Sequence, residues 1–243
     1  MPVLQEINLQ MNIKQKQIKF LLVFAINASI SAFSQISSGQ DFKPISQKVL
    51  NNPDPEDWLM WRGGYENWGY SPLAEINRDN VDRLRLAWSW EFAPAAPGSN
   101  GMQIEPTVYD GVMYIRHSNE KYSAHDAATG DLIWQYSRAL ASEVARYETR
   151  LTVHRGRGVF IYEDKLISHA TDGMLFALDP RDGTLIWEVA MQDFRSGQQP
   201  SGAPVAFGGS LVVPYNCTAW TAPDPCHLSA CSTEDGSLPW RWF

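Results

Sequence analysis

Three cysteines and one histidine with redox or metal-binding chemistry stand close together near the end of the sequence. Cys217, Cys226 and Cys231 are the three cysteines among 243 residues, and His227 follows Cys226 directly. In an oxidising compartment, a disulfide between Cys217 and Cys226 would close a short loop and leave Cys231 unpaired. A metal site at Cys226 and His227 is the rival interpretation, although zinc sites do not favour this spacing. No Cys-x-x-Cys-His motif occurs, so the sequence predicts no attached c-type haem.

The elements that must position these groups belong to a repeat. Trp134, Trp187 and Trp240 are separated by 53 residues twice over, and each tryptophan closes a similar phrase. Ala, Gly, Leu and Trp are identical in all three phrases, which are Tyr122–Trp134, Leu175–Trp187 and Leu228–Trp240. Units of roughly 40 to 50 residues with about four strands are typical of propeller blades. The sequence therefore predicts an all-β propeller with about three blades present.

Each unit contains the turn chemistry of β-hairpins. Asp126 has a carboxylate that can accept backbone N–H groups across a turn, and Gly130 supplies the positive φ of the reversal. Equivalent residues recur in the second unit, with Asp179 and Gly183. The strand that contains Pro239 should be the outermost of its blade, because proline lacks a ladder donor. Further hairpins are predicted at Val108–Ile115, Gly158–Ile167 and Pro204–Val213.

The N-terminal residues carry a targeting pattern. Three lysines precede the apolar run Phe20–Ile26, and small residues follow as far as Ser34, so residues 1–34 are interpreted as a signal peptide. An uncleaved anchor is the alternative, and translation starts at either Met1 or Met11. Residues 35–54, with few large apolar groups, are interpreted as a linker. The expected location is periplasmic or secreted, with no stable membrane span.

The charge of the chain restricts its partners. The formal net charge is −7, and it becomes −9 without residues 1–34, which hold three lysines and one glutamate. An acidic chain of this kind makes a nucleic-acid partner improbable.

The segment Asp57–Trp88 resembles the opening of the quinoprotein alcohol dehydrogenases, which are methanol and ethanol dehydrogenase-like enzymes that use pyrroloquinoline quinone (PQQ). The words Ser71-Pro-Leu73 and Leu86-Ala-Trp88 carry much of the resemblance, and later segments follow in the same order. The resemblance covers about residues 55–243 and implies a partial PQQ-repeat β-propeller there. Members of that family have eight-bladed rings of more than twice this length. The chain is therefore expected to come from a truncated longer reading frame, and the alternative is a divergent short protein that closes its ring in another way.

The resemblance also implies three cofactor-binding residues. PQQ is a flat quinone with three carboxylates, so its site needs an arginine or backbone donors, small hydroxyls and apolar planes. Gln103, Arg157 and Ser201 fall where the family places cofactor contacts. Each has a rival interpretation: Gln103 as a loop amide, Arg157 as a surface arginine with Arg155 as a competitor for the cofactor role, and Ser201 as a turn cap.

The sequence departs from the family in two places. Leu151 and Thr152 stand where methanol dehydrogenase-like enzymes carry two adjacent cysteines. Asn216–Thr221 replaces a Gly-Ala-Glu segment that supplies a calcium carboxylate, so Ca²⁺ is not expected to find its usual ligand here. The aspartate that serves the family as general base lies in a later blade, and no catalytic base or metal ligand is assigned within this chain.

Two functions remain open at this point. The first is the N-terminal portion of a periplasmic PQQ-dependent alcohol dehydrogenase, in which an alcohol gives a hydride to the quinone and an external acceptor such as a cytochrome c takes the electrons. This chain alone is then expected to be inactive. The second is a non-catalytic PQQ-like propeller that serves as a protein-binding scaffold.

Overall fold

The computed structural model describes residues 42–91, 104–117, 120–140, 143–144, 158–196, 198–200, 202–217 and 227–243. The chain divides into the units Met1–Gly39 and Gln40–Phe243, and all described residues belong to the second unit. The predicted signal peptide lies outside the described residues.

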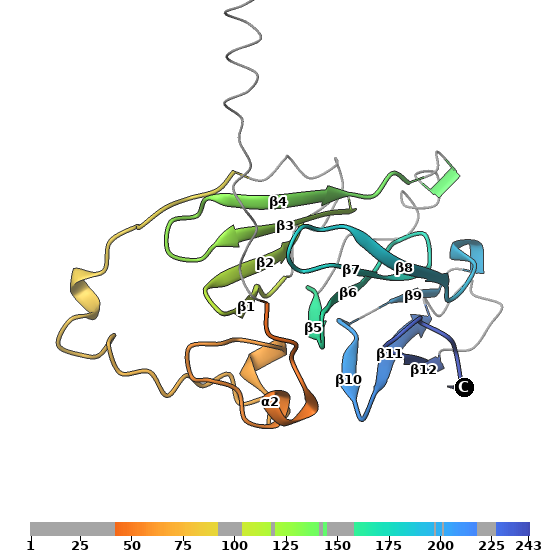
Figure 1. The fold of residues 1–243 in the computed structure, drawn as a ribbon, viewed down its shortest axis with the longest axis horizontal. Helices are drawn as coiled ribbons and strands as arrows, with labels where there is room; N and C mark the ends of the chain where they lie inside the picture. Colours follow the sequence, from red (N-terminus) through yellow and green to blue (C-terminus); the bar gives the residue numbers. More distant parts are fainter. Residues whose placement is uncertain are drawn as a thin grey trace, which may run out of the picture. The chain divides into compact units, whose positions relative to one another are not determined.

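Three antiparallel sheets make up most of the second unit, and we call them blades 1, 2 and 3 (Figure 1). In each blade the four main strands lie side by side in chain order. Blade 1 contains β1 (Thr107–Tyr109), β2 (Val112–Arg116), β3 (Lys121–Asp126) and β4 (Leu132–Ser137); blade 2 contains β5 (Phe160–Tyr162), β6 (Lys165–His169), β7 (Met174–Leu178) and β8 (Leu185–Ala190); blade 3 contains β9 (Gln198–Pro200), β10 (Val205–Phe207), β11 (Ser210–Cys217), β12 (His227–Ser232) and β13 (Trp240–Trp242). These sheets confirm the prediction of a partial β-propeller.

The hairpin turns form where the sequence predicts them. Asp110 and Gly111 both have positive φ, at 47° and 74°, which matches the tight turn between β1 and β2. The carboxylate of Asp126 accepts the backbone N–H groups of Ala128 at 2.9 Å and Thr129 at 2.8 Å. The strand β13 pairs with β12 at the end of the sheet order, which confirms that the last strand of this unit is outermost; Pro239 lies directly before β13 rather than within it.

Consecutive blades make the same contact, in which a tryptophan packs on a glycine. A Cβ atom at Gly183 would lie 2.6 Å from the ring of Trp134, so only glycine allows this approach. The indole Nε1–H of Trp134 donates a hydrogen bond of 2.8 Å to the carbonyl of Pro180. A Cβ at Gly236 would likewise lie 2.9 Å from the ring of Trp187. Trp134 and Trp187 are therefore wedged between blades, whereas Trp240 is 48% exposed.

Trp88 makes this contact with blade 1. A Cβ at Gly130 would lie 2.6 Å from its ring, and its Nε1–H donates a bond of 3.1 Å to Ala127. Trp88 precedes Trp134 by 46 residues rather than by the 53 of the repeat. The phrase Leu86-Ala-Trp88 shares its Leu-x-Trp ending with the repeat, which is the sequence signal for this additional contact.

The short helix α2 (Gln47–Asn51) and the residues before it connect the three blades at one end. The Lys43 carbonyl accepts the Tyr109 hydroxyl at 2.9 Å, and Ile45 forms an isolated β-bridge with Glu163. The side chain of Gln47 accepts the Gly208 N–H at 2.9 Å. These three contacts reach blades 1, 2 and 3 in turn. Residues 43–47, which belong to the segment interpreted as a linker, are thus packed against all three blades.

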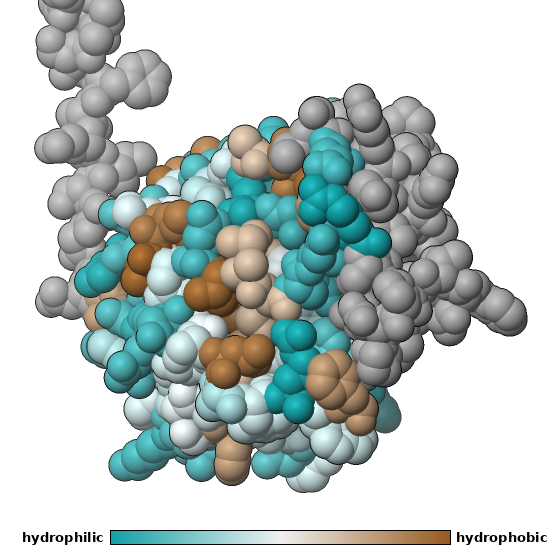
Figure 2. All heavy atoms as spheres, turned by 90° about the vertical axis from the view of Figure 1, so that its right-hand side faces the viewer, coloured by the Kyte–Doolittle hydropathy of each residue, from teal (hydrophilic) through white to brown (hydrophobic). Residues whose placement is uncertain are grey.

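The surface mixes polar and apolar side chains. Figure 2 shows hydrophobic residues among hydrophilic ones on the face that it displays. Large apolar side chains are most exposed in the segment before blade 1 and near the last strand, and they include Trp68 at 75%, Leu86 at 83%, Trp242 at 71% and Phe243 at 64%. Three-residue 3₁₀ turns occur at Trp61–Gly63, Val81–Arg83 and Phe194–Ser196. No helix in the described ranges is long and apolar enough to cross a membrane.

Candidate functional site

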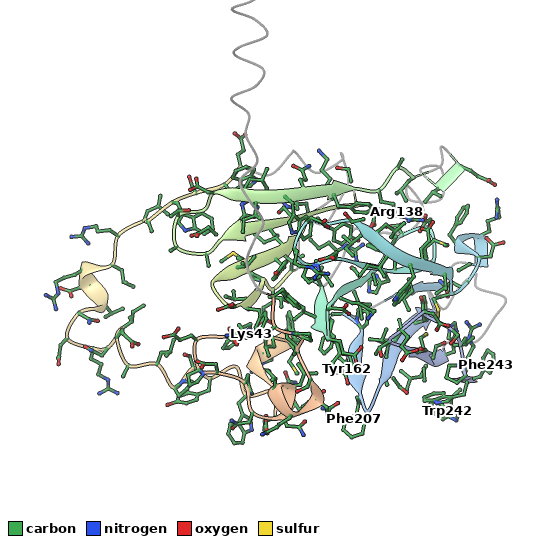
Figure 3. All side chains as sticks on the ribbon, in the orientation of Figure 1. Lys43, Arg138, Tyr162, Phe207, Trp242 and Phe243 are labelled. Carbon is green, nitrogen blue, oxygen red and sulfur yellow. The ribbon has the colours of Figure 1, made fainter. Side chains whose placement is uncertain are left out.

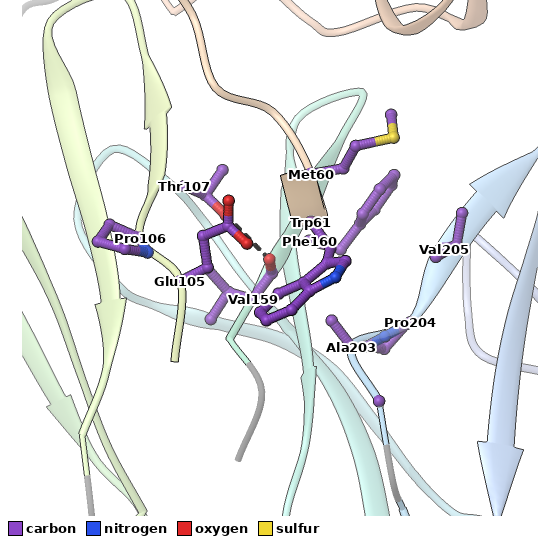
Figure 4. Close-up of a pocket in the computed structure, with 11 residues that line it drawn as sticks. Met60, Trp61, Glu105, Pro106, Thr107, Val159, Phe160, Ala203, Pro204 and Val205 are labelled. Atoms are coloured by element: carbon purple, nitrogen blue, oxygen red, sulfur yellow. Dashed lines mark hydrogen bonds between the residues drawn. The ribbon is translucent and has the colours of Figure 1, made fainter. Parts of the chain in front are cut away.

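A cavity of about 220 Å³ lies where the first strands of the three blades meet (Figure 4). We call it the axial cavity. Its walls come from the starts of β1, β5 and β10 and from the segment that precedes blade 1. The lining residues are Met60, Trp61, Glu105, Pro106, Thr107, Val159, Phe160, Gly202, Ala203, Pro204 and Val205. The cavity is therefore mostly apolar.

Glu105 is the one charged side chain of the described lining. Its carboxylate accepts the indole N–H of Trp58 and the backbone N–H of Arg62, the latter at 3.1 and 3.2 Å from its two oxygens. Backbone bonds between Trp58 and Val108 hold the same segments together. Glu105 thus links the segment that contains Met60 and Trp61 to the start of β1 through hydrogen bonds on both sides of these two residues.

Two close contacts join blades 1 and 2 at the cavity. The Thr107 hydroxyl donates to the Val159 carbonyl at 3.0 Å, which Figure 4 marks with a dashed line. Gly158 has a φ of +104°, and a Cβ there would lie 3.0 Å from the Glu105 carbonyl oxygen. Glycine is therefore required at this position both for its backbone conformation and for the approach of the two strands.

Blade 3 contributes the third wall of the cavity. This wall is the segment between β9 and β10, where the strand that pairs with β11 is interrupted. Both β9 and β10 pair with β11, with partners Tyr215–Cys217 and Ser210–Val212 respectively. Between these stretches β11 contains Pro214, which has no N–H to donate to a ladder. The segment of Gly202, Ala203 and Pro204 leaves the sheet opposite this proline and lines the cavity.

The three predicted cofactor-binding residues, Gln103, Arg157 and Ser201, lie outside the described residues. In the sequence they stand one or two positions before residues that line the axial cavity, namely Glu105, Val159 and Gly202. The structure therefore brings together the three segments that follow them, and their roles stay predictions. Arg155, Leu151 and Thr152 also lie outside the described residues.

A buried polar network that the sequence did not predict lies next to the third wall. Arg116 donates to Glu120 at 2.9 Å and to His169 Nδ1 at 3.1 Å. His169 Nε2 is 2.6 Å from the carbonyl oxygen of Gly202. Glu120 also accepts the Thr171 hydroxyl at 2.5 Å. The network begins in blade 1, crosses blade 2 and ends at the cavity wall in blade 3.

The network determines the charge of its members. Burial lowers the pKa of Arg116, but the Glu120 carboxylate outweighs this and the net direction is upward. Burial raises the pKa of Glu120, and Arg116 together with Thr171 reverses this to a net decrease. Burial and then the Arg116 charge lower the pKa of His169 to about 4. Arg116 and Glu120 are thus charged and His169 is neutral near pH 7.

A sequence signal for this network exists in the repeat. Arg116 and His169 are 53 residues apart, which is the period of the tryptophans, and they end the second strands of successive blades. Equivalent positions of adjacent blades are neighbours, so the period places these two side chains together. The spacing among the histidines alone does not reveal this pairing, because Arg116 is not a histidine.

The cysteine region is described in part. Cys226 and the side chain of Cys217 lie outside the description, so the predicted disulfide stays a prediction. Cys231 is a buried free thiol, and its Sγ lies 3.6 Å from the Met191 sulfur. His227 stacks on Tyr215 with ring centroids 4.8 Å apart. Among the described residues no group of three or more His, Cys, Asp or Glu could hold a metal ion.

A family model described as the glucose/ethanol/alcohol dehydrogenase β-propeller domain, with the label PQQ, matches residues 58–242. The chain belongs to this family. Among curated members, it is 31% identical over 237 residues to the dehydrogenase subunit of the quinone alcohol dehydrogenase from Gluconobacter oxydans, covering 95% of this chain and 30% of that protein. It is 30% identical over 238 residues to the quinohaemoprotein alcohol dehydrogenase from Comamonas testosteroni, covering 91% of this chain and 31% of that protein.

Solved structures of the PQQ propeller family share the fold. The quinohaemoprotein alcohol dehydrogenase ADHIIG from Pseudomonas putida HK5 matches with a TM-score of 0.68 and 27% identity, over 86% of this chain and 29% of that chain. A europium-containing methanol dehydrogenase matches with a TM-score of 0.68 and 25% identity, over 80% of this chain and 33% of that chain. The chain thus spans about 30% of the length of the curated relatives.

The apolar side chains that line the axial cavity suit the flat ring system of PQQ. Trp61, Phe160 and Pro204 present apolar surface, which suits a flat quinone. Glu105 accepts hydrogen bonds and cannot pair with the cofactor's carboxylates. Donors for those carboxylates would come from Gln103, Arg157 and Ser201, which have the required amide, guanidinium and hydroxyl chemistry.

Proposed function

We propose that this chain forms the N-terminal blades of a periplasmic PQQ-dependent alcohol dehydrogenase, and that the axial cavity is part of its cofactor site. One observation carries the proposal: the PQQ family match over residues 58–242 coincides with a cavity bordered by the segments that follow all three predicted cofactor residues. The Lys-rich start and the apolar run Phe20–Ile26 support a periplasmic or secreted location.

In this proposal the residues of the chain bind and orient the cofactor. Arg157 pairs with a cofactor carboxylate, while Gln103 and Ser201 contribute hydrogen bonds. Trp61 and Phe160 exclude water from the ring faces. When bound, PQQ supplies a two-electron acceptor for the hydride of a small alcohol. An external acceptor such as a cytochrome c would take the electrons.

The test compares two arginines that stand two positions apart. In the full-length protein, Arg157→Lys should weaken PQQ binding about tenfold or more, because lysine cannot keep a bidentate contact with a carboxylate. Arg155→Lys is the matched control and should bind PQQ like the wild type. Equilibrium titration of the quinone measures both affinities.

Two results would overturn the proposal. The opposite ranking of the two variants would show that Arg155 is the cofactor arginine and that the assigned site is wrong. A full-length protein that binds no quinone at all would favour the scaffold function instead.

A further inference from the structure

The His169 ring has a fixed orientation and a fixed proton. An arginine guanidinium can only donate hydrogen bonds, so His169 Nδ1 must accept from Arg116. The proton of the neutral ring is then on Nε2, which donates to the Gly202 carbonyl oxygen 2.6 Å away. Because the Nδ1 contact dictates the tautomer, Arg116 determines that His169 is a donor toward the cavity wall.

The Gly202 carbonyl is a group that the sheet does not satisfy. Residues 198–200 and 205–207 pair with β11, and Gly202 lies in the break between them. Gly202 is half-buried, and a carbonyl removed from water without a partner is costly, so the His169 donor stabilises the break in its observed form. His169 is itself only 1% exposed, so it is held where it can provide that donor.

Glu120 keeps the donor system in place. It accepts bonds from Arg116, Tyr122 and Thr171, and it is 2% exposed. These bonds satisfy a buried carboxylate and hold Arg116 beside His169. The chain therefore uses a buried ion pair of blade 1 to orient one imidazole of blade 2 at the wall formed by blade 3.

We propose that His169 is a positioning residue of the axial cavity: through its bond to the Gly202 carbonyl it sets the segment 202–205 and thereby the affinity for the quinone. This inference rests on the proposed function, because it assigns His169 a role toward the cofactor that the cavity would hold. His169 does not line the cavity and acts through Gly202 alone.

A pair of variants that differ by one methylene group tests the inference in the full-length protein. The Gln side chain places its amide nitrogen near the position of His Nε2, so His169→Gln can still donate to Gly202. The Asn side chain is shorter and reaches only the position of Nδ1, so His169→Asn keeps a partner for Arg116 and loses the bond to Gly202. By quinone titration, His169→Asn should bind about tenfold more weakly, and His169→Gln within about threefold of the wild type.

His125 provides the control for general destabilisation. It is fully buried in blade 1 and bonds to Ser123 and to the Gly130 carbonyl, away from the cavity. His125→Asn should lower the melting temperature without changing the quinone affinity. Equal affinities of His169→Asn and His169→Gln, or an equal loss in His125→Asn, would overturn the positioning role while leaving the proposed function intact.

A second measurement needs neither cofactor nor variant. Long-range ¹H–¹⁵N spectra of protein with labelled histidine should show His169 as the Nε2–H tautomer at neutral pH. A ring protonated on Nδ1 would contradict the inference even if both variants failed to fold. A wild-type protein that binds no quinone would instead overturn the proposed function, and this inference with it.

Discussion

The contact between blades 1 and 2 and the contact between blades 2 and 3 use the same residue types but differ in their hydrogen bonds. Trp134 is 7% exposed, and its Nε1–H bonds to Pro180. Trp187 is half-buried, and its Nε1 is buried with no hydrogen-bond partner among the described residues. The equivalent carbonyl, three residues before Gly236, belongs to Thr233. The apolar part of the contact is therefore repeated, and the polar part is not.

The ion pairs around the two contacts differ as well. Arg138, labelled in Figure 3, extends from the end of blade 1 to Asp172 at 2.8 Å and Glu188 at 2.6 Å in blade 2. Between blades 2 and 3, Arg241 donates to the Met191 carbonyl at 2.6 Å instead. Tryptophan and glycine therefore define the packing of the blades, whereas the polar groups are specific to each contact.

The largest effect is expected at the glycine of the first contact. Gly183→Ala would place a methyl group 2.6 Å from Trp134 at a residue with a φ of +75°. Backbone strain and overpacking together should lower the free energy of unfolding by about 2 to 5 kcal/mol. Gly111→Ala is the control, because its φ is +74° and no atom lies within 4 Å of the new methyl group. Equal losses in urea unfolding would show that strain, and not the tryptophan contact, dominates.

The free energy of unfolding should depend on pH through His169, which joins blade 2 to Gly202 of blade 3, whereas the apolar tryptophan contacts do not titrate. His169, which faces Arg116 and Glu120, has a pKa of about 4, below the ordinary value of about 6.5. The unfolded chain therefore binds more protons between these values, and stability is lost as the pH falls. From pH 7 to pH 5 the loss from this residue should be about 2 kcal/mol. His117, whose pKa is also about 4, adds to the total effect.

His169→Gln isolates the contribution of His169, because glutamine does not titrate. Urea unfolding at pH 7 and pH 5 should show a pH dependence that is smaller by about 2 kcal/mol in this variant than in the wild type. The same pH dependence in both proteins would mean that His169 is not held neutral by its surroundings.

The smallest effect is expected from the difference between two Trp→Phe variants, each of which removes the indole N–H together with part of the ring. Trp134→Phe loses a hydrogen bond and leaves the Pro180 carbonyl unpaired, whereas Trp187→Phe removes an N–H that has no partner among the described residues. Trp134→Phe should therefore destabilise the protein by at least about 1 kcal/mol more than Trp187→Phe. Thermal unfolding of the two variants measures the difference. A larger loss for Trp187→Phe would contradict the comparison.

The sequence predicts the fold well where one residue type determines the geometry. The glycine turns, the Asp126 turn and the repeated tryptophans all depend on local chemistry, and their blades are confirmed. The period of 53 residues does not include Trp88, because Trp88 precedes Trp134 by 46 residues. The segment around Ile45 has few large apolar residues, so its burial against blade 2 depends on a backbone bridge that composition does not reveal.

The candidate site is harder to predict from the sequence than the fold. Arg116 and His169 are different residue types, so a comparison of identical residues between the repeats does not find them. Their pairing is found only when the period of 53 residues is applied to residues of different types. The break that exposes Gly202 depends on Pro214 in the neighbouring strand, a long-range effect. The roles of Gln103, Arg157 and Ser201 come from family resemblance and stay predictions.

A crystal structure of the full-length protein grown with PQQ would show whether the axial cavity holds the cofactor. We expect quinone density in this cavity, with the ring faces against apolar walls that include Trp61 and Phe160 and a carboxylate on Arg157. We also expect His169 Nε2 to remain bonded to Gly202. Quinone density elsewhere in the protein, with the axial cavity filled by its own side chains, would show that the cavity is not the cofactor site.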